Sequence, residues 1–301
     1  MSPGGVLTAL VTPYDEAGEV ATDVLARHVD RLAEAGVDGF FACGTTGEGA
    51  CLSADEKRRV VTTVQERAGD RDVVAAVIQP DTRSALAECR MYADLGVRYV
   101  AAVAPYYVRV DERELVDHFT ALAEASTVPL LLYDIPGNTG NPITEAVMRA
   151  MLPHPNVIGV KDSTGDFSRF LRLVIEDSVE GANSTRWIQG EDTLDVVALL
   201  AGAAGVVSGL SNVLPQAFVR LLRAVRSGDT ATALAMQHVI NALHALVRST
   251  AKGVPAIRVA LSQMGLGTRF LRSREFSLGT DLDGAVRDAV ESATRLYERY
   301  S

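Results

Sequence analysis

Cysteine is scarce in this sequence, and its few copies form no recognisable pattern. Cys43, Cys51 and Cys89 are odd in number, widely spaced and without a Cys-x-x-Cys pair. A disulfide scaffold normally uses an even set of cysteines, and a zinc site uses closely spaced ligands. We therefore expect neither of these, and a reducing, cytoplasmic environment fits the composition.

Long apolar runs and an excess of basic residues are also missing. No segment reaches the roughly 18 uninterrupted apolar residues that predict a membrane-spanning helix. The first residues, MSPGGVLTALVTPYDEAG, lack the basic start of a signal peptide. The net charge is −9 and the pI is about 5.1. Because an acidic surface repels phosphate backbones and anionic lipids, we expect neither nucleic acid nor membrane as a partner.

What the sequence does contain is a regular alternation of short apolar runs and longer helical patterns. Hydrophobic residues make up 48% of the 301 residues, which is ample for a large core. The apolar runs are continuous rather than alternating, as in strands that are covered on both faces. The eight predicted strands are 5–12, 37–43, 72–78, 97–104, 128–135, 156–161, 186–190 and 204–209.

The segments between these runs carry helix start and stop signals. Ser53 is a predicted N-cap, and Glu56 three residues later completes a capping box. Thr22 begins another helical pattern, which ends at Gly36, a residue suited to a C-cap. Similar patterns cover 111–125 and 191–203.

Eight strand–helix alternations predict an α/β fold of the (β/α)8, or TIM, barrel type. A doubly wound sheet is the alternative, but the first strand is not followed by a glycine-rich phosphate fingerprint. After Ser227 only helical patterns remain, at 229–250, 254–265 and 281–299. We therefore predict a catalytic barrel in residues 1–226 and a C-terminal helical region in residues 227–301.

Lys161 ends the sixth predicted strand, and active sites of barrels lie at the C-terminal ends of strands. Burial lowers the pKa of an ammonium group and increases the fraction of free amine. A free amine attacks a ketone, and the resulting iminium withdraws electrons from a neighbouring C–C bond. The alternative is a structural lysine whose ammonium reaches water or pairs with Asp162.

Hydroxyl groups end three other predicted strands. Tyr133 ends the fifth strand, where its phenol can relay protons or simply complete the core. Thr45 and Thr46 lie in the turn GTTGE after the second strand, where amides and hydroxyls can hold a carboxylate. The alternative is a plain turn between strand and helix. The pair Tyr106–Tyr107 after the fourth strand either extends a proton relay or packs at the rim.

The motifs GTTGE, PYY, YDIPGNTG and GVKDSTGD, in this order and spacing, resemble the dihydrodipicolinate synthase / N-acetylneuraminate lyase family of class I aldolases. The resemblance covers nearly the whole chain. It implies a (β/α)8 barrel with C-terminal helices and a homotetramer built from tight dimers. It also implies a Schiff base between Lys161 and pyruvate or a 2-keto acid, with Tyr133 as the acid/base group.

The resemblance assigns further roles around the same site. Thr45 corresponds to the hydroxyl that links two tyrosines in a relay, and Tyr107 to the second tyrosine, which the family's synthases take from the neighbouring subunit. The remaining positions implied to bind substrate are Gly44, Thr46, Asn138, Gly190 and Val207.

Asn138 departs from the pattern of the synthases, which carry an arginine there to bind the carboxylate of the aldehyde substrate. An amide cannot replace that charged, bidentate group. We therefore expect a lyase that releases pyruvate and an aldehyde from a 2-keto-3-deoxy sugar acid or a 4-hydroxy-2-oxo acid. One alternative is 4-hydroxy-tetrahydrodipicolinate (dihydrodipicolinate) synthase, which condenses pyruvate with aspartate semialdehyde. Another is a non-catalytic relative that binds keto acids, although Lys161 and both tyrosines are present.

Two acidic residues follow the seventh predicted strand. In the neuraminate lyases this loop binds sugar hydroxyls, so Glu191 or Asp192 can serve that purpose here. The alternative is that both carboxylates offset the dipole of the next helix. None of the five histidines falls at a predicted strand end, so we expect no metal. Because the lysine amine acts as the electron sink, we expect no organic cofactor.

Overall fold

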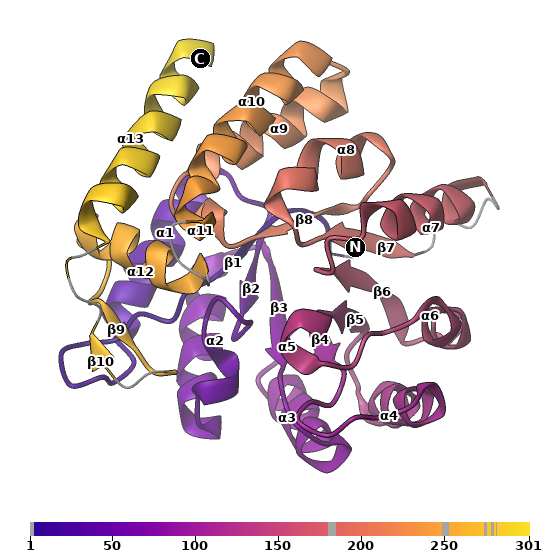
Figure 1. The fold of residues 1–301 in the computed structure, drawn as a ribbon. Helices are drawn as coiled ribbons and strands as arrows, with labels where there is room; N and C mark the ends of the chain where they lie inside the picture. The colour runs from indigo at the N-terminus through magenta and orange to yellow at the C-terminus, as the bar shows by residue number, and fades with distance from the viewer. Residues whose placement is uncertain (1–2, 180–184, 249–252, 274–275, 278–279, 281) are drawn as a thin grey trace.

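The computed structural model describes residues 3–179, 185–248, 253–273, 276–277, 280 and 282–301. Eight parallel strands form a closed barrel in chain order (Figure 1). All eight predicted strands are confirmed, with ends trimmed by one to three residues in most cases. The strands are β1 Gly5–Ala9, β2 Gly39–Ala42, β3 Asp72–Val77, β4 Tyr99–Val103, β5 Leu130–Asp134, β6 Val157–Asp162, β7 Arg186–Gln189 and β8 Gly205–Ser208.

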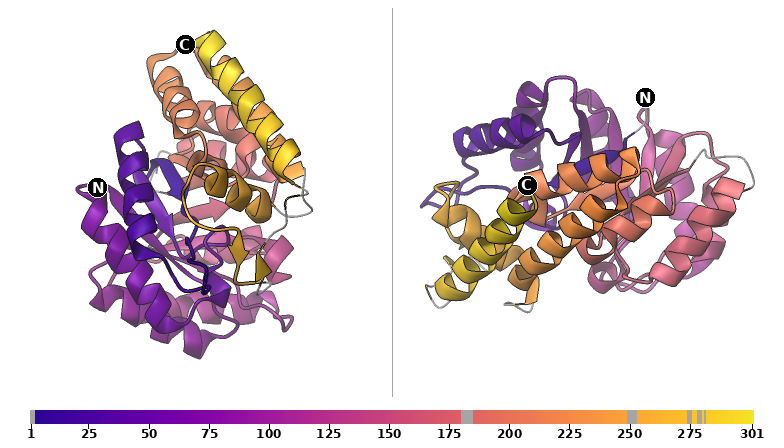
Figure 2. Two further views of the ribbon diagram at one scale, coloured as in Figure 1. Left: turned by 90° about the vertical axis from the view of Figure 1, so that its left-hand side faces the viewer. Right: turned by 90° about the horizontal axis from the view of Figure 1, so that it is seen from above.

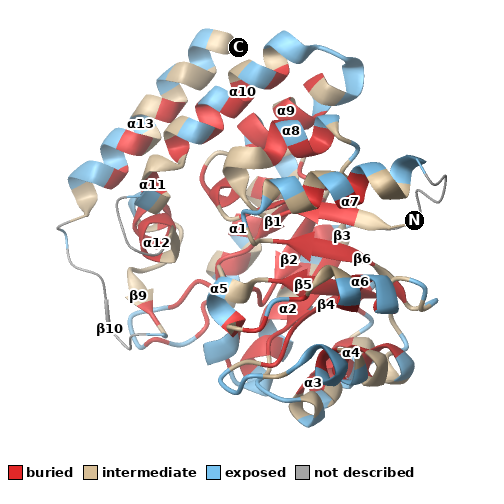
Figure 3. Cartoon of the chain, turned by 45° about the vertical axis from the view of Figure 1, so that its right-hand side comes forward, coloured by how far each residue is buried: buried red, intermediate tan, exposed pale blue. Residues whose placement is uncertain are grey.

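The strands bury both of their faces in two separate hydrophobic clusters. Successive side chains of a strand point to opposite sides of the sheet. In β5, Leu131 and Tyr133 therefore point into the barrel, while Leu130 and Leu132 pack against the outer helices. This double burial explains why the strands are continuous apolar runs, and most of the barrel's strand residues are buried (Figure 3).

Helices cover the outside of the barrel between consecutive strands. The predicted capping box is confirmed, because Ser53 and Glu56 exchange hydrogen bonds at the start of α2. The predicted end at Gly36 is also confirmed, with a left-handed φ of 90°. The covering helices are α1 Thr22–Ala35, α2 Ala54–Ala68, α3 Thr82–Asp94, α4 Glu112–Ala125, α6 Glu145–Met151, α7 Phe167–Val179, α8 Asp195–Leu200 and α9 Pro215–Ser227. The single turn α5 Pro136–Thr139 directly follows β5.

The helix predicted at 191–203 is shorter in the structure and begins with a separate 3-10 turn. That turn, η2, covers Asp192–Leu194, and α8 ends at Leu200. Gln237 supplies a physical reason, because its side chain accepts from Val196 N (2.8 Å) and donates to Asp192 O (2.9 Å). These contacts with a distant helix satisfy backbone groups that a longer α8 would have paired internally.

The C-terminal part contains the predicted helices and one small sheet that the sequence did not predict. The helix expected at 229–250 is interrupted at His244, and its last residues lie outside the described part of the chain. Helices α13 and α10 lie side by side beyond α9 (Figure 2). The elements are α10 Thr230–Leu243, α11 Ala245–Arg248, α12 Gly253–Gln263, the antiparallel pair β9 Phe270–Leu271 and β10 Phe276–Ser277, and α13 Asp283–Tyr300.

Among the described residues, no helix combines the length and the apolar character needed to cross a membrane.

Candidate active site

Lys161 and Tyr133 are register partners on the neighbouring strands β6 and β5. Both side chains lie inside the barrel, and Lys161 is only 4% exposed. The Lys161 Nζ lies 3.6 Å from the centre of the Tyr133 ring and 4.4 Å from the centre of the Phe41 ring. The two residues that the sequence singled out as reactive are therefore in direct contact.

Burial lowers the pKa of Lys161 below its ordinary value of 10.5. Loss of hydration is the main cause, and the proximity of Tyr133 and Asp192 opposes it in part. The alternative of a water-reaching or Asp162-paired lysine does not hold, because the amine is enclosed and the Asp162 carboxylate pairs with Arg169 instead. Lys161 is thus a buried amine with an increased tendency to be neutral.

The turn after β2 brings Thr45 to Tyr133. The Thr45 Oγ1 lies 3.3 Å from the Tyr133 hydroxyl, within hydrogen-bonding distance. The turn is tight enough to require glycine, since a Cβ on Gly49 would lie 1.7 Å from the Cys43 carbonyl oxygen. Thr46 points toward β8, where a Cβ added to Gly209 would come within 3.2 Å of its hydroxyl.

Glu48 anchors the same turn to the C-terminal part of the chain. Its carboxylate accepts from the Arg258 Nη2 (3.1 Å) and from the Ser273 backbone N (2.9 Å). Both Glu48 and Arg258 are buried, and Arg258 also donates to the Thr12 carbonyl at 2.6 Å. No role was predicted for either residue, because no local sequence pattern indicates that α12 lies beside the turn.

A cavity of about 640 Å³ opens over this constellation. Of the residues that the sequence singled out, Thr45, Tyr106 and Asn138 line it. Lys161 and Tyr133 are not among its lining residues, but the Tyr133 hydroxyl is hydrogen-bonded to Thr45 and the Tyr133 ring contacts Lys161. The other side chains that shape its wall include Glu48, Cys51, Ile78, Ile135, Thr139, Val254, Pro255, Leu271 and Ser273.

Three predicted substrate-binding residues are closely packed in the structure. Val207 is 3% exposed and belongs to the apolar cluster inside the barrel. Gly190 lies against β6, so that a Cβ there would be 2.1 Å from the Ser163 hydroxyl oxygen. Gly44 lies beside the Phe41 ring, with room for no side chain (2.8 Å to a hypothetical Cβ).

Tyr107 lies outside the site of its own chain. Its side chain is 97% exposed, and its φ of 78° is uncommon for a bulky residue. Asn141 holds this loop in place by donating to the Pro105 and Val108 carbonyls (2.8 Å each) and accepting from Val110 N (3.3 Å). The structure therefore separates Tyr107 from Tyr133 and fixes it in an outward conformation.

Replacing Asn141 with alanine is expected to loosen this loop. Leaving the buried backbone groups unpaired should cost about 1–3 kcal/mol of unfolding free energy. Denaturant unfolding and hydrogen exchange of segment 105–110 measure the effect.

Asn156 provides a matched control, since its side chain donates to the Ala123, Ser126 and Val128 carbonyls at the other end of the barrel. Asn156→Ala should lower stability by a similar amount and leave exchange at 105–110 unchanged. Equal exchange in both variants would contradict the assignment to Asn141.

The acidic residues after β7 differ in their surroundings. Burial raises the pKa of Asp192 to about 6, while Ser208 and Lys161 act in the opposite direction. Glu191 lies 3.5 Å from the His244 Nε2 and accepts from the Thr193 hydroxyl. Neither carboxylate caps a helix through a hydrogen bond, but Asp192 lies in the first turn of η2, where a negative charge also offsets the helix dipole. Asp192 also lies within electrostatic reach of the lysine.

Within the described ranges, no three histidine, cysteine, aspartate or glutamate side chains gather as a metal site would require.

Known proteins share this architecture. The profile of the dihydrodipicolinate synthetase family matches residues 2–292. A 4-hydroxy-tetrahydrodipicolinate synthase from Mycolicibacterium paratuberculosis is 38% identical over 231 residues, which are 76% of this chain and 75% of that protein.

Solved structures agree with this match. The 4-hydroxy-tetrahydrodipicolinate synthase from Methylacidiphilum fumariolicum SolV is 26% identical, with a TM-score of 0.91 over 99% of this chain and 98% of that one. The wild-type sialic acid aldolase of Ruminococcus gnavus has a TM-score of 0.89 over 99% of each chain, and at 22% identity it shows the fold alone. Together with the barrel and its buried lysine, the family profile and the relatives establish that the chain belongs to the dihydrodipicolinate synthetase family and is an aldolase-type lyase.

Proposed function

We propose that this protein is a class I aldolase that holds pyruvate or another 2-keto acid as a Schiff base on Lys161. The observation that carries the proposal is the buried Lys161 amine in contact with Tyr133, whose hydroxyl is hydrogen-bonded to Thr45. A lysine with a lowered pKa supplies the free amine that attacks a carbonyl carbon. The iminium is the electron sink, so the reaction requires neither a metal nor an organic cofactor.

The proposed cleavage needs three proton transfers, and Tyr133 is the proposed acid/base group for them. Attack of the amine on the C2 carbonyl gives a carbinolamine, which gains a proton on oxygen and loses water to become the iminium. The C4 hydroxyl then loses its proton as the C3–C4 bond breaks, releasing an aldehyde and leaving an enamine. Protonation of the enamine at C3 and hydrolysis return pyruvate and the free lysine. The Gly44–Thr46 turn, with its amides and hydroxyls, is the proposed partner of the keto acid carboxylate.

For the aldehyde portion, we favour a 2-keto-3-deoxy sugar acid or a 4-hydroxy-2-oxo acid. Asn138 lines the cavity where a synthase would have an arginine, and its amide suits a neutral hydroxyl better than a carboxylate. Asp192, close to Lys161 and Ser208, offers a second partner for a substrate hydroxyl. Val207 and Gly190, both closely packed, remain the further positions that we expect to bind the substrate.

The second candidate is 4-hydroxy-tetrahydrodipicolinate synthase, favoured by the names of the relatives that are 38% and 26% identical. It would act on the same Schiff base but accept aspartate semialdehyde. Reduction with borohydride in the presence of pyruvate tests the shared chemistry. We expect a covalent adduct on Lys161, and no adduct at saturating pyruvate would contradict both candidates. Turnover of pyruvate with any aldehyde, measured without borohydride, would in turn reject a purely keto-acid-binding role.

Exchanging Asn138 for arginine is expected to shift the aldehyde preference. A guanidinium forms charge-assisted, bidentate bonds, so kcat/KM for aspartate semialdehyde should rise about tenfold or more. The same change should lower kcat/KM for neutral D-glyceraldehyde. Steady-state assays with pyruvate and each aldehyde measure both effects.

Asn138→Gln is the control, because it lengthens the side chain without adding charge and should give no gain with aspartate semialdehyde. Efficient turnover of aspartate semialdehyde by the unaltered protein, above that of D-glyceraldehyde, would favour the synthase instead.

Assembly completes the proposal. Tyr107 and Val108 are both strongly exposed at one rim, 97% and 64%, and Tyr107 is held in an outward conformation. We propose that Tyr107 joins the proton relay of a neighbouring subunit in a homotetramer of tight dimers.

A further inference from the structure

The strands that carry Lys161 and Tyr133 are also joined outside the barrel. Asp134 follows Tyr133 and Asp162 follows Lys161, and the two aspartates are register partners. Because successive side chains alternate, both carboxylates point away from the barrel interior. They are buried, at 0% and 2% exposure. Two carboxylates thus face each other behind the reactive pair.

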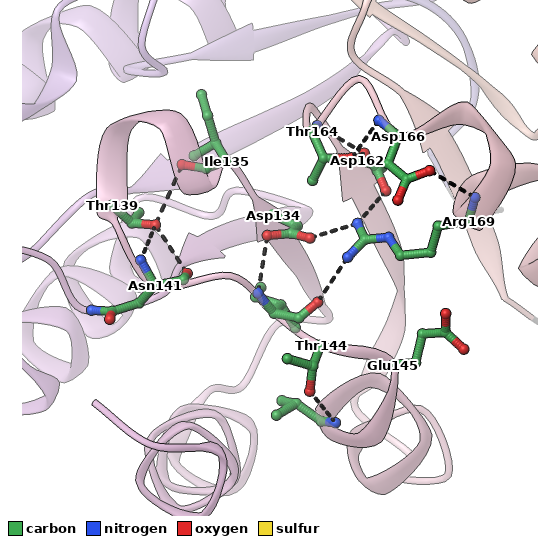
Figure 4. A network of polar contacts seen from close by, with 12 residues as sticks. Asp134, Ile135, Thr139, Asn141, Thr144, Glu145, Asp162, Thr164, Asp166 and Arg169 are labelled. Atoms are coloured by element: carbon green, nitrogen blue, oxygen red, sulfur yellow. Dashed lines mark hydrogen bonds and ion pairs between the residues drawn. The ribbon is translucent and has the colours of Figure 1, made fainter. Parts of the chain in front are cut away.

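Arg169 on α7 joins these carboxylates (Figure 4). Its Nη2 donates to the Asp134 Oδ2 at 2.7 Å and to the Asp162 Oδ2 at 2.6 Å. Its Nη1 donates to the Ile143 carbonyl at 3.3 Å. One guanidinium therefore forms hydrogen bonds with both buried carboxylates. It also connects β5, β6 and the segment that contains Ile143.

The segment between β6 and α7 forms a turn that brings the Arg169 side chain back to Asp162. The Asp162 Oδ1 accepts from the Thr164 backbone N (2.9 Å) and hydroxyl (2.6 Å). Gly165 reverses the chain with a φ of 77°. Asp166 then accepts from the Arg169 backbone N at 3.1 Å, which caps the first turn of α7. The motif KDSTGD therefore contains Lys161 and also forms the hydrogen-bonded connection between β6 and α7.

Asp134 is fixed in a comparable way. Its Oδ1 accepts from the Ile143 backbone N at 3.0 Å, so both oxygens have partners. Burial raises the pKa of Asp134 and the charge of Asp162 adds to this, whereas Arg169 acts against both. Without the arginine, two like charges would repel each other across neighbouring strands or one would take up a proton.

We propose that Arg169 is a positioning residue that sets the separation of Tyr133 and Lys161 by joining Asp134 and Asp162. The proposal rests on the proposed function, since it assigns Arg169 a role in proton transfer between those groups. The contact between the amine and the Tyr133 ring spans only 3.6 Å, and proton transfer is sensitive to small displacements. Loss of the hydrogen bonds from Arg169 to Asp134 and Asp162 would therefore affect the chemical step more than substrate binding.

Arg169→Met tests this against a control on the same helix. We expect kcat to fall about 10- to 100-fold, with KM changed by less than about threefold, because a displacement near 1 Å can cost about 100-fold. Arg172→Met, also on α7, removes an exposed ion pair with Glu145 of α6 and should leave both constants unchanged. The kcat of Arg169→Lys should lie between those of the unaltered protein and Arg169→Met, since one ammonium group matches two carboxylates less well than a guanidinium.

A double variant separates positioning from general stability. In Asp134→Asn/Arg169→Met one of the repelling charges is gone, while the amide oxygen can still accept from Ile143. We expect kcat of the double variant to be at least about fivefold higher than that of Arg169→Met, because the remaining carboxylate no longer faces a like charge. An unchanged kcat in Arg169→Met would overturn the proposal. Equal losses in Arg169→Met and Arg172→Met, or a double variant no better than Arg169→Met, would also overturn it.

A ligand-free crystal structure of Arg169→Met distinguishes this proposal from the proposed function. We expect the Lys161 Nζ to have moved by about 1 Å or more relative to the Tyr133 ring. If the unaltered protein forms no pyruvate adduct, the proposed function fails, and this structural comparison still decides the role of Arg169. An unmoved pair would overturn the positioning role. Should Arg169→Met fail to fold, Arg169→Lys and the double variant take its place in both measurements.

Discussion

Replacing Lys161 with methionine is expected to abolish turnover and at the same time stabilise the fold. Methionine has a similar length and is apolar, so it suits a site lined by Tyr133 and Phe41. No amine remains to form the Schiff base, so neither adduct nor product should be detected. Because the variant buries no ionisable group, the unfolding free energy near neutral pH should rise by on the order of 1 kcal/mol.

The pH dependence of this gain follows from the lowered pKa of Lys161. At neutral pH the unfolded chain holds the lysine proton more firmly than the folded protein does, which favours unfolding. The penalty is fully present below the folded pKa and disappears above the ordinary value of 10.5. The stability difference between Lys161→Met and the unaltered protein should therefore shrink as the pH rises toward that value. Denaturant unfolding at several pH values measures this, and a variant that is less stable at neutral pH would contradict it.

Lys57 is the matched control, because it is an equally buried lysine in a different environment. Its amine donates to both Glu88 oxygens, at 2.9 Å and 2.7 Å. Lys57→Met leaves an uncompensated carboxylate in the interior and should destabilise the protein by about 3–5 kcal/mol. The same contrast predicts which lysine pyruvate modifies. Lys57 is engaged by a carboxylate, whereas Lys161 lies against aromatic rings, so borohydride should mark Lys161 and spare Lys57.

Tyr133→Phe is expected to slow turnover severely without preventing Schiff base formation. The ring stays, together with its edge-to-face contact with Phe41 at 5.6 Å. The hydroxyl that bonds to Thr45 is lost, and with it the proposed proton donor. General acid–base groups contribute about 10²- to 10⁴-fold, so kcat should fall within that range while KM changes little. Steady-state kinetics measure the loss of turnover, and the rate of adduct formation with pyruvate measures Schiff base formation separately.

Tyr92→Phe shows whether loss of any buried phenol has this effect. The Tyr92 hydroxyl donates to the Glu88 Oε1 (3.0 Å) and to the Ala76 carbonyl (3.3 Å), away from Lys161. Its removal should lower stability and leave kcat unchanged. A kcat for Tyr133→Phe close to that of Tyr92→Phe would rule out the assigned role.

Local chemistry in the sequence accounts for most of the fold. Continuous apolar runs predicted the strands because every strand is covered inside and outside. Ser53 and Glu56 predicted the start of α2 because their hydrogen bonds span only three residues. Lys161 and Tyr133 were predicted because they lie together at the C-terminal ends of neighbouring strands, where the active sites of barrels lie, and because their motifs resemble those of a known family.

The features that escaped prediction depend on residues far apart in the chain. Gln237 shortens the helix after β7 from a distance of 41 residues. Arg169 lies only seven residues from Asp162, but its second partner, Asp134, is 35 residues away on another strand. The outward position of Tyr107 follows from hydrogen bonds with Asn141, more than 30 residues later. No periodicity or local motif encodes such contacts.

The anchoring of Glu48 by Arg258 and Ser273 has a consequence for how the protein is made. The hydrogen bond between Glu48 and Arg258 spans 210 residues, and that with Ser273 spans 225. Chains emerge from the ribosome with their N-terminal part first. A nascent chain therefore carries Thr45 and Thr46 long before it carries the groups that hold their turn in place. All eight strands can be complete while the turn proposed to bind the substrate still lacks these hydrogen bonds, which form only after Arg258 and Ser273 have been synthesised.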